Sequence, residues 1–445
     1  MQTAALACAR KVPPSILAGA AFIAVVSAIG AVIVRGRSVQ NEGTTNGAQK
    51  RLPKFWIDSP SKTQLGISAH EAENLPYPQN VLPGGRDVET PYGSIHVFEW
   101  GPEDGERVLL LHGISTPCLA LGGVAHTLVE SGYRVMLFDF FGRGYSDTPL
   151  GLPFDLRLYS TQILLVLASS SLPWTGDGGF HLIGYSLGGG VAVAFASYFP
   201  HMLRSLTLVA GAGLIRSGHI GWMTRLLYSS GILPEWLLES LTRSRLMPAK
   251  QQSEGRGPGP TAPPEQPLVV VRPEIPSADP RAPGHGTVRQ QSNSDVSGGD
   301  SFDNAVLPSG ATVVSVMEWQ LRSHAGFVRA FISTLRHAPI IEEHEAWRRL
   351  ASRLAERRVR GTSKDSDQQK LEAGLTGGKV LLVLGASDPV IVMDELVPDA
   401  TNILGPDGLQ TVVLDAGHEV AIVKGPEVAR AAIRFWEQTS STLSL

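Results

Sequence analysis

Short apolar runs alternate with longer stretches of helical character along most of this chain of 445 residues. The apolar runs are rich in valine, leucine and isoleucine and are bounded by glycine and polar residues, which is typical of buried strands. Strands are expected at residues 92–98, 108–111, 135–139, 181–183, 206–209, 380–384 and 411–414. Strands that alternate with helices form mostly parallel sheets covered by helices. The pattern therefore predicts an α/β protein with a mostly parallel central sheet.

The alternation stops between residues 214 and 341. Residues 222–241 and 316–335 are apolar, contain several aromatic side chains and are predicted to be helices. Between them, residues 248–310 are crowded with proline, glycine, serine and glutamine. Such a composition cannot bury enough apolar surface to offset the entropy of ordering the chain, so a disordered loop is predicted. The insertion divides the predicted core into two parts, residues 91–213 and 342–445.

The first 37 residues differ in character from the rest. Residues 16–34 are uncharged and apolar, and basic residues lie on both sides of them. About 20 apolar residues suffice to cross a bilayer as a helix, so residues 1–37 are predicted to be a membrane anchor. The basic residues are slightly more numerous after the span, which favours a cytoplasmic catalytic domain. Residues 38–90 are polar, with frequent proline and glycine, and are predicted to be a linker.

Two alternatives to an anchor are open. A cleaved signal peptide has an apolar region of only about 7–15 residues that ends in a small-residue cleavage site. Here the apolar run continues directly to Arg35, which favours an uncleaved span. A mitochondrial presequence would fit the lack of acidic residues before Glu42 but not so apolar a stretch.

A candidate nucleophile lies in the sequence Gly184-Tyr185-Ser186-Leu187-Gly188. An apolar, strand-like run precedes this Gly-x-Ser-x-Gly pattern, and a helical stretch follows it. A serine on a sharp strand-to-helix turn exposes its hydroxyl for attack on a carbonyl carbon. The flanking glycines suit a strained turn where a Cβ atom would collide with the backbone. A small residue in an ordinary tight turn is the alternative interpretation.

Serine needs a base and an acid that orients the base. Asp388 and His418 each follow a predicted strand, so they are expected at the same edge of the parallel sheet as Ser186. Asp415 is a second candidate for the acid, but it lies only three residues before His418, at the end of the predicted strand. That position makes the far ring nitrogen hard to reach. We therefore predict a triad of Ser186, His418 and Asp388.

The negative charge that develops during acyl transfer requires backbone N–H donors. One candidate is the N–H of Leu187, directly after the nucleophile. The other is the N–H of Ile114, in the loop that follows the predicted strand 108–111. His112, at the start of this loop, is expected to have a structural role, because it precedes the serine in the chain and another base is available.

The chain resembles the α/β-hydrolase family over about residues 92–437. The resemblance depends on five segments in that family's order, 111–114, 139–146, 184–188, 385–388 and 417–418. It implies the α/β-hydrolase fold and an acyl-enzyme mechanism, and it implies that the insertion at residues 214–341 is a helical cap over the active site. Because it has a serine at the turn, the chain resembles the esterases, lipases and serine peptidases of the family. Dehalogenases and epoxide hydrolases have an aspartate at that position.

The expected function is that of a membrane-anchored, single-pass serine hydrolase that cleaves a carboxylic ester, with a lipid-like acyl group favoured by the aromatic cap. This reaction requires no metal or organic cofactor. The formal net charge of −3 provides no field that would attract nucleic acid. A serine peptidase or a carbon–carbon bond hydrolase on the same fold is an alternative, as is a binding protein without turnover, since fold does not determine chemistry.

Overall fold

The computed structural model describes residues 54–64, 66–176, 179–219, 228, 233–247, 300–360 and 374–441. The chain separates into two units, Met1–Lys54 and Phe55–Leu445. All elements described below belong to the second unit.

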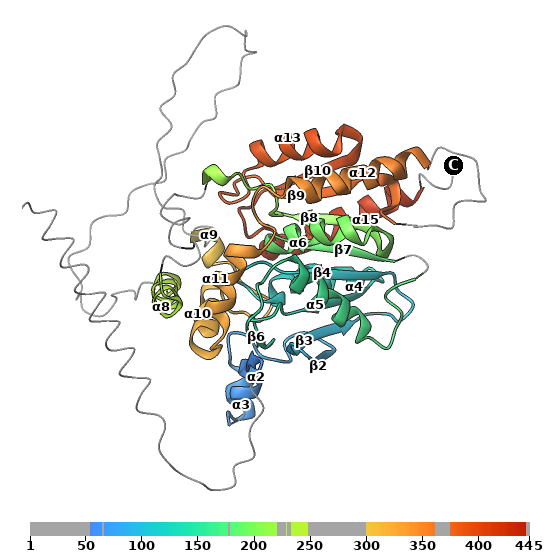
Figure 1. Cartoon of the computed structure of the whole chain (residues 1–445). Helices are drawn as coiled ribbons and strands as arrows, with labels where there is room; N and C mark the ends of the chain where they lie inside the picture. Colours follow the sequence, from blue (N-terminus) through green and yellow to red (C-terminus); the bar gives the residue numbers. More distant parts are fainter. Residues whose placement is uncertain are drawn as a thin grey trace, which may run out of the picture. The chain divides into compact units, whose positions relative to one another are not determined.

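An eight-stranded sheet forms the centre of this unit (Figure 1). Its strands are β2 (Gly85–Thr90), β3 (Gly93–Trp100), β4 (Arg107–Leu111), β5 (Arg134–Phe138), β7 (Phe180–Tyr185), β8 (Leu203–Val209), β9 (Val380–Gly385) and β10 (Leu409–Leu414). The spatial order is β10-β9-β8-β7-β4-β5-β3-β2. Strands β4, β5, β7, β8, β9 and β10 pair in parallel, and β3 pairs antiparallel with both β2 and β5. The predicted mostly parallel sheet is therefore confirmed.

Helices cover both faces of the sheet, which explains why its central strands are apolar along their whole length. One face is covered by α4 (Gly122–Glu130), α14 (Val420–Val423) and α15 (Gly425–Ser441). The other is covered by α5 (Leu156–Ala168), α6 (Leu187–Tyr198), α12 (His344–Arg360) and α13 (Met393–Leu404). Every residue of β7 and β9 is buried between these two layers.

The cap lies at one end of the sheet (Figure 1). Its helices in the described part of the chain are α8 (Glu235–Leu246), α9 (Asp300–Asp303), α10 (Val313–Ser323) and α11 (Phe327–His337). The single helix predicted at residues 316–335 is therefore two helices, α10 and α11. The break occurs where the His324 side chain turns inward and accepts a hydrogen bond from the N–H of Gly326.

The two chain connections of the cap are joined to each other. Ile215, on the way into the cap, forms a parallel bridge with Ile341, on the way out. Gly213 donates a backbone hydrogen bond to Ile340 and accepts one from Glu343. The cap therefore begins and ends at one paired base.

Part of the predicted linker at residues 38–90 is not a linker. Residues 54–90 contribute β1 (Trp56–Ile57), α2 (Pro60–Thr63), α3 (Ala69–Glu73) and β2. Strand β1 pairs with β6 (Thr148–Pro149). Tyr77 and Leu82 are buried in the core. The prediction failed because these apolar residues are isolated in the sequence, so no periodicity marks them as core residues. Residues 38–53 lie outside the described part.

The predicted disordered loop extends too far at its C-terminal end. Residues 248–299 lie outside the described part of the chain, but residues 300–310 are packed. Phe302 and Leu307 are 3% and 2% exposed, and the hydroxyl of Ser309 donates to the carbonyl of Pro76. The order here comes from contacts with the core rather than from local composition.

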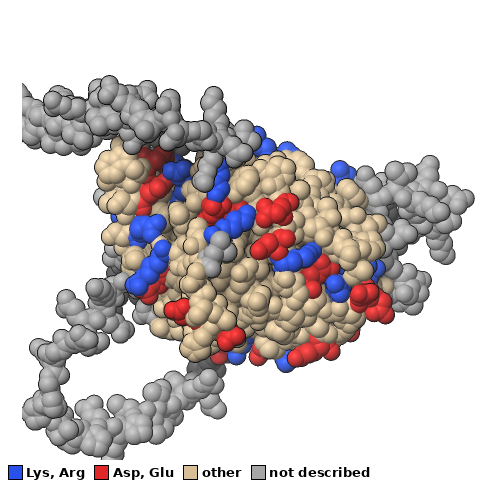
Figure 2. Space-filling view, turned by 90° about the horizontal axis from the view of Figure 1, so that it is seen from below, with Lys and Arg blue, Asp and Glu red and all other residues tan. Residues whose placement is uncertain are grey.

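In the described part of the chain, no helix is long and apolar enough to cross a membrane. The predicted span at residues 16–34 lies outside this part. On the face seen in Figure 2, acidic and basic side chains are interspersed. This mixture agrees with the small net charge of the sequence.

Candidate active site

Ser186 lies on the turn between β7 and α6. Its backbone has φ 52° and ψ −118°, a conformation that costs free energy for a residue with a side chain. A Cβ atom on Gly184 would collide with the carbonyl of Gly188, and one on Gly188 would collide with the carbonyl of Leu111. The Gly-x-Ser-x-Gly pattern is therefore a steric requirement of this turn, and the predicted strand–turn–helix arrangement is confirmed.

The structure brings the three predicted triad side chains together. The Ser186 Oγ lies 3.0 Å from Nε2 of His418. On the other side of the ring, Nδ1 of His418 lies 2.9 Å from Oδ2 of Asp388. A carboxylate oxygen accepts hydrogen bonds, so this contact favours the tautomer with the ring proton on Nδ1, which leaves Nε2 able to accept the hydroxyl proton of Ser186.

Asp388 is held in place independently of the histidine. Its Oδ1 accepts hydrogen bonds from the backbone N–H groups of Val390 and Ile391, at 2.8 and 2.9 Å. The side chain of Asp388 is 1% exposed. Asp415, the other candidate, is exposed at the end of β10. The geometry thus places Asp388 rather than Asp415 against the imidazole.

The loop that carries His418 is fixed by its neighbours. The hydroxyl of Tyr185 donates to the carbonyl of His418 at 2.8 Å. The side chain of Glu419 accepts from the N–H of Gly417 at 2.9 Å. Tyr185 precedes the nucleophile, so one β7 residue links the serine turn to the histidine loop.

Residues 112–116 form the loop after β4, which we call the 112–116 loop. It lies directly beside the nucleophile, since a Cβ atom on Gly113 would be 3.4 Å from the Cβ of Ser186. Leu187 is the first residue of α6, so its N–H has no acceptor within the helix. Within the described part of the chain, the backbone hydrogen bonds outside helices and strands include none donated by Ile114. Both predicted oxyanion donors are thus on segments that meet at Ser186.

His112 is not placed to act as the base. Its Nε2 accepts a hydrogen bond from the N–H of Phe140 at 2.8 Å, and its Nδ1 lies 2.8 Å from the carbonyl of Gly113. The proton is therefore on Nδ1. Complete burial lowers its pKa to about 3, so the ring is neutral. His112 links the 112–116 loop to the loop after β5, as expected for a structural residue.

The cap places apolar side chains over this site. Its helices form a cluster that packs against Ile114, consisting of Leu238, Leu321, Phe327, Val328, Phe331 and Ile332. The ring of Phe302, in α9, lies 5.7 Å from the ring of His418, centroid to centroid. Sequence reasoning missed Phe302, because it assigned residues 248–310 to a disordered loop. An aromatic residue at the end of a stretch almost free of aromatics was the one available signal.

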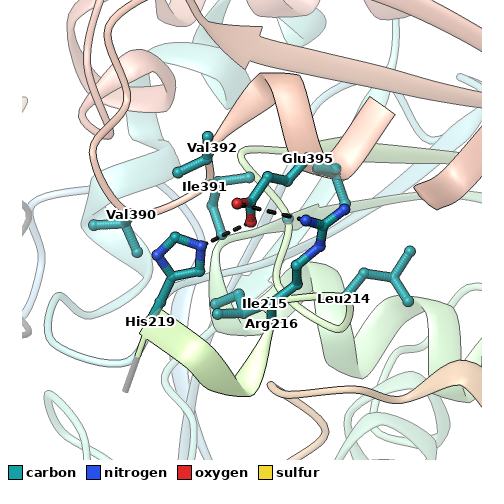
Figure 3. A pocket seen from close by; sticks show the side chains of 10 residues that line it. Leu214, Ile215, Arg216, His219, Val390, Ile391, Val392 and Glu395 are labelled. Atoms are coloured by element: carbon teal, nitrogen blue, oxygen red, sulfur yellow. Dashed lines mark hydrogen bonds and ion pairs between the residues drawn. The ribbon is translucent and has the colours of Figure 1, made fainter. Parts of the chain in front are cut away.

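A small pocket lies beside the loop that carries Asp388, between the chain entering the cap and the start of α13 (Figure 3). Apolar side chains, among them Leu214 and Ile391, line it. At its rim Glu395 pairs with His219 at 2.7 Å and with Arg216 at 3.6 Å. The lining includes neither Ser186 nor His418. This pocket therefore lies between the base of the cap and α13 and does not contain the nucleophile or the base.

Residues 106–239 match the protein family described as alpha/beta hydrolase fold. A serine hydrolase-like protein of Danio rerio is 32% identical over 132 residues, which is 29% of this chain and 38% of the relative. One of Dictyostelium discoideum is 29% identical over 141 residues, 31% of this chain and 38% of the relative. The matched stretch therefore spans about two fifths of these relatives.

Among solved structures, a bacterial membrane phospholipase A has a TM-score of 0.48 at 17% identity, covering 86% of this chain and 92% of that one. A putative lipase of Acinetobacter baumannii has a TM-score of 0.47 at 16% identity, covering 89% and 99%. Likeness at this level carries no argument about activity. The match to the family described as alpha/beta hydrolase fold, residues 106–239, covers the strand–turn–helix segment around Ser186.

Proposed function

We propose that this protein is a serine hydrolase that cleaves carboxylic esters through an acyl-enzyme intermediate, with a lipid-like acyl group as the favoured substrate. The observation that carries the proposal is the continuous hydrogen-bonded chain from Ser186 through His418 to Asp388, at 3.0 and 2.9 Å. Nucleophile, base and acid are recognised by such geometry rather than by sequence position.

In the proposed reaction, Ser186 Oγ attacks the ester carbonyl carbon while Nε2 of His418 takes its proton. Asp388 stabilises the resulting imidazolium through the proton on Nδ1. The N–H groups of Leu187 and Ile114 donate to the oxyanion. The imidazolium then protonates the departing alcohol. A water molecule, deprotonated by His418, attacks the acyl-enzyme and releases the acid and free Ser186.

The preference for an apolar acyl group rests on the cap. The apolar cluster of the cap contacts the side chain of Ile114, the same residue whose N–H is the proposed oxyanion donor. An acyl chain that leaves Ser186 in this direction would be buried against aliphatic and aromatic groups. Burying one methylene contributes roughly 0.8 kcal/mol, so longer chains should bind more tightly until the space is filled.

Membrane attachment is also proposed. It rests on the uncharged residues 16–34, whose length suffices for a helix that satisfies its own backbone hydrogen bonds in lipid. The proposed anchor would hold the protein at the membrane that contains a lipid-like substrate. A slight excess of basic residues after the span favours a cytoplasmic catalytic domain.

The decisive experiment compares wild type with Ser186→Ala and Ser197→Ala on p-nitrophenyl esters of increasing chain length. Ser197 is a buried serine whose hydroxyl donates to the Ala194 carbonyl within α6, so it controls for loss of a hydroxyl. We expect Ser186→Ala to lower kcat by more than about a thousandfold, because loss of a triad member typically costs more than that. Ser197→Ala should hydrolyse esters at close to the wild-type rate.

Labelling with a fluorophosphonate separates the alternatives. Wild type and Ser197→Ala should be labelled, and Ser186→Ala should not. A folded wild-type protein that is neither labelled nor hydrolytic would be a binding protein. Faster cleavage of peptide anilides than of esters would instead assign the site to a peptidase.

A further inference from the structure

Side chains hold three consecutive backbone carbonyls of the 112–116 loop. The Gly113 carbonyl accepts from Nδ1 of His112 at 2.8 Å. The Ile114 carbonyl accepts from Nε of Arg143 at 2.7 Å. The Ser115 carbonyl accepts from Nε2 of Gln320 at 2.9 Å. Backbone carbonyls in loops usually accept hydrogen bonds from water. In this loop, three consecutive carbonyls instead accept hydrogen bonds from buried side chains.

Gln320 belongs to the cap rather than to the hydrolase core. It lies on α10 and is completely buried. Its amide nitrogen donates to Ser115, and its Oε1 accepts from the N–H of Gly144 at 2.9 Å. One cap side chain therefore ties the 112–116 loop to the loop after β5.

Arg143 comes from the core but is supported by the cap. Its Nη2 donates to the hydroxyl of Thr334 at 3.2 Å. Its guanidinium lies 5.3 Å from the ring centre of Phe327 and 5.9 Å from that of Phe331, all on α11. The side chain is 1% exposed. In the described part of the chain it forms no ion pair with a carboxylate, so its donors serve neutral oxygens, among them the Ile114 carbonyl.

These contacts control the direction of the Ile114 N–H. A trans peptide is planar, so its N–H and carbonyl point in opposite directions. His112 fixes the peptide before the Ile114 Cα through the Gly113 carbonyl. Arg143 fixes the peptide after it through the Ile114 carbonyl. With both planes fixed, the φ and ψ angles of Ile114 are fixed, and so is the aim of its N–H beside Ser186.

We propose that Arg143 and Gln320 are positioning residues through which cap helices α10 and α11 hold the 112–116 loop in the geometry that stabilises the oxyanion. The inference rests on the proposed function. In this arrangement the cap contributes to catalysis. If the cap moved away from the core, the 112–116 loop would lose its hydrogen bond to Gln320, and Arg143 would lose its contacts with α11.

The test uses the full chain and compares Gln320→Met and Thr334→Val with Gln162→Met. Each substitution is nearly isosteric, and Thr334→Val removes the hydroxyl that accepts from Arg143 and also contacts the hydroxyl of Tyr159 at 2.9 Å. Gln162 is a matched control, since it is a buried glutamine that bonds Asp139 and Phe141 and does not touch residues 113–115. Thermal melting establishes that each variant is folded.

Kinetics on a p-nitrophenyl ester and inhibition by an alkylboronic acid distinguish positioning from simple stability. The boronic acid forms an anionic tetrahedral adduct on the serine and so reports on oxyanion binding. We expect Gln320→Met to lower kcat about 10- to 100-fold and to raise the boronate Ki by a similar factor, with little change in KM, since small displacements of catalytic groups cost about 100-fold.

Two substitutions of Arg143 test whether a conservative change restores activity. Arg143→Met should lower kcat and raise the boronate Ki, and Arg143→Lys should restore part of both, because lysine keeps a charged donor but not the planar fork. A folded Gln320→Met variant with wild-type kcat and boronate Ki would overturn the inference. Equal losses in Gln320→Met and Gln162→Met would also overturn it. A wild-type protein without hydrolysis or labelling would overturn the proposed function instead, and the positioning role with it.

Discussion

At the scale of single residues, the site joins groups that are far apart in the sequence. Ser186 and His418 are separated by 232 positions, and His418 and Asp388 by 30. Each lies after a strand of the same parallel sheet, so all three meet at the carboxyl edge. The imidazole is the one group that contacts both others, which makes its tautomer the critical property of the site.

Replacing the proposed acid tests that property. We expect Asp388→Asn to lower kcat by roughly 10⁴-fold, since an amide partner favours the wrong histidine tautomer. Asp415→Asn is the matched control, because Asp415 is exposed at the end of β10, and it should change kcat less than about twofold. Steady-state kinetics on a short-chain ester measures both, and the reverse ranking would transfer the role to Asp415.

At the scale of elements, the cap is joined to the core by buried polar groups as well as by apolar packing. His324, between α10 and α11, lies with Nε2 2.9 Å from the carbonyl of Ser146 and accepts from the N–H of Gly326 through Nδ1. Complete burial lowers its pKa to about 4, because a charged imidazole would lose its hydration. The neutral ring is therefore the form that fits the junction.

This junction should make stability depend on pH. The folded-state pKa of His324, about 4, lies below the ordinary value of 6.5. Its contribution is therefore complete above about pH 6.5 and is lost as pH falls towards 4. The slope is about 1.4 kcal/mol per pH unit for one such group.

We expect His324→Gln to show a shallower loss of unfolding free energy between pH 6.5 and 4.5 than wild type. Urea unfolding measured across this range supplies the comparison. His70→Gln is the control, since His70 is exposed on α3 and should leave the wild-type slope unchanged. Identical slopes in wild type and His324→Gln would show that the junction does not contain the titrating group.

The long insertion has a boundary that a deletion can locate. Replacing residues 253–299 with a short Gly/Ser linker should leave stability and short-chain esterase activity close to wild type, because their composition lacks core residues. Extending the deletion to residue 309 should destabilise the protein by several kcal/mol, because it removes the buried Phe302 and Leu307.

Thermal melting and esterase assays on the two deletions check this boundary. A collapse of the folded protein after the shorter deletion would mean that residues 253–299 contribute to the core. An extended deletion as stable as wild type would show that α9 and its contact with His418 are dispensable.

At the scale of the whole molecule, the catalytic unit begins well after the proposed anchor. The second unit begins at Phe55, and the hydroxyl of the buried Tyr77 donates to Asp139 at 3.1 Å. Removing residues 1–37 should therefore leave the fold and the short-chain esterase activity intact. Removing residues 1–82 should abolish folding, since it takes away both Tyr77 and Leu82.

The same truncation tests attachment to a membrane. Full-length protein should remain in the pellet after an alkaline carbonate wash, whereas protein lacking residues 1–37 should be soluble. Long-chain esters presented in vesicles should lose more rate on truncation than soluble short-chain esters. Release of the full-length protein by carbonate, or a mature N-terminus beyond Val34, would identify residues 1–37 as a processed targeting segment.

The sequence by itself determined the features that depend on local pattern. Apolar runs in the sequence predicted the parallel strands β4, β5, β7, β8, β9 and β10 as well as the antiparallel strand β3. The turn at Ser186 can be recognised in the sequence because only glycine fits at positions 184 and 188. Asp388 and His418 could be predicted because the ends of parallel strands share one edge. These signals are local, and they do not require knowledge of the packing.

Tertiary structure alone decided the rest. Tyr77 and Phe302 become core residues only because distant elements cover them. The contacts of Arg143 and Gln320 with the 112–116 loop join segments 29 and 205 positions apart. No periodicity encodes such contacts, because a buried polar side chain finds its partner only when the surrounding surfaces have packed.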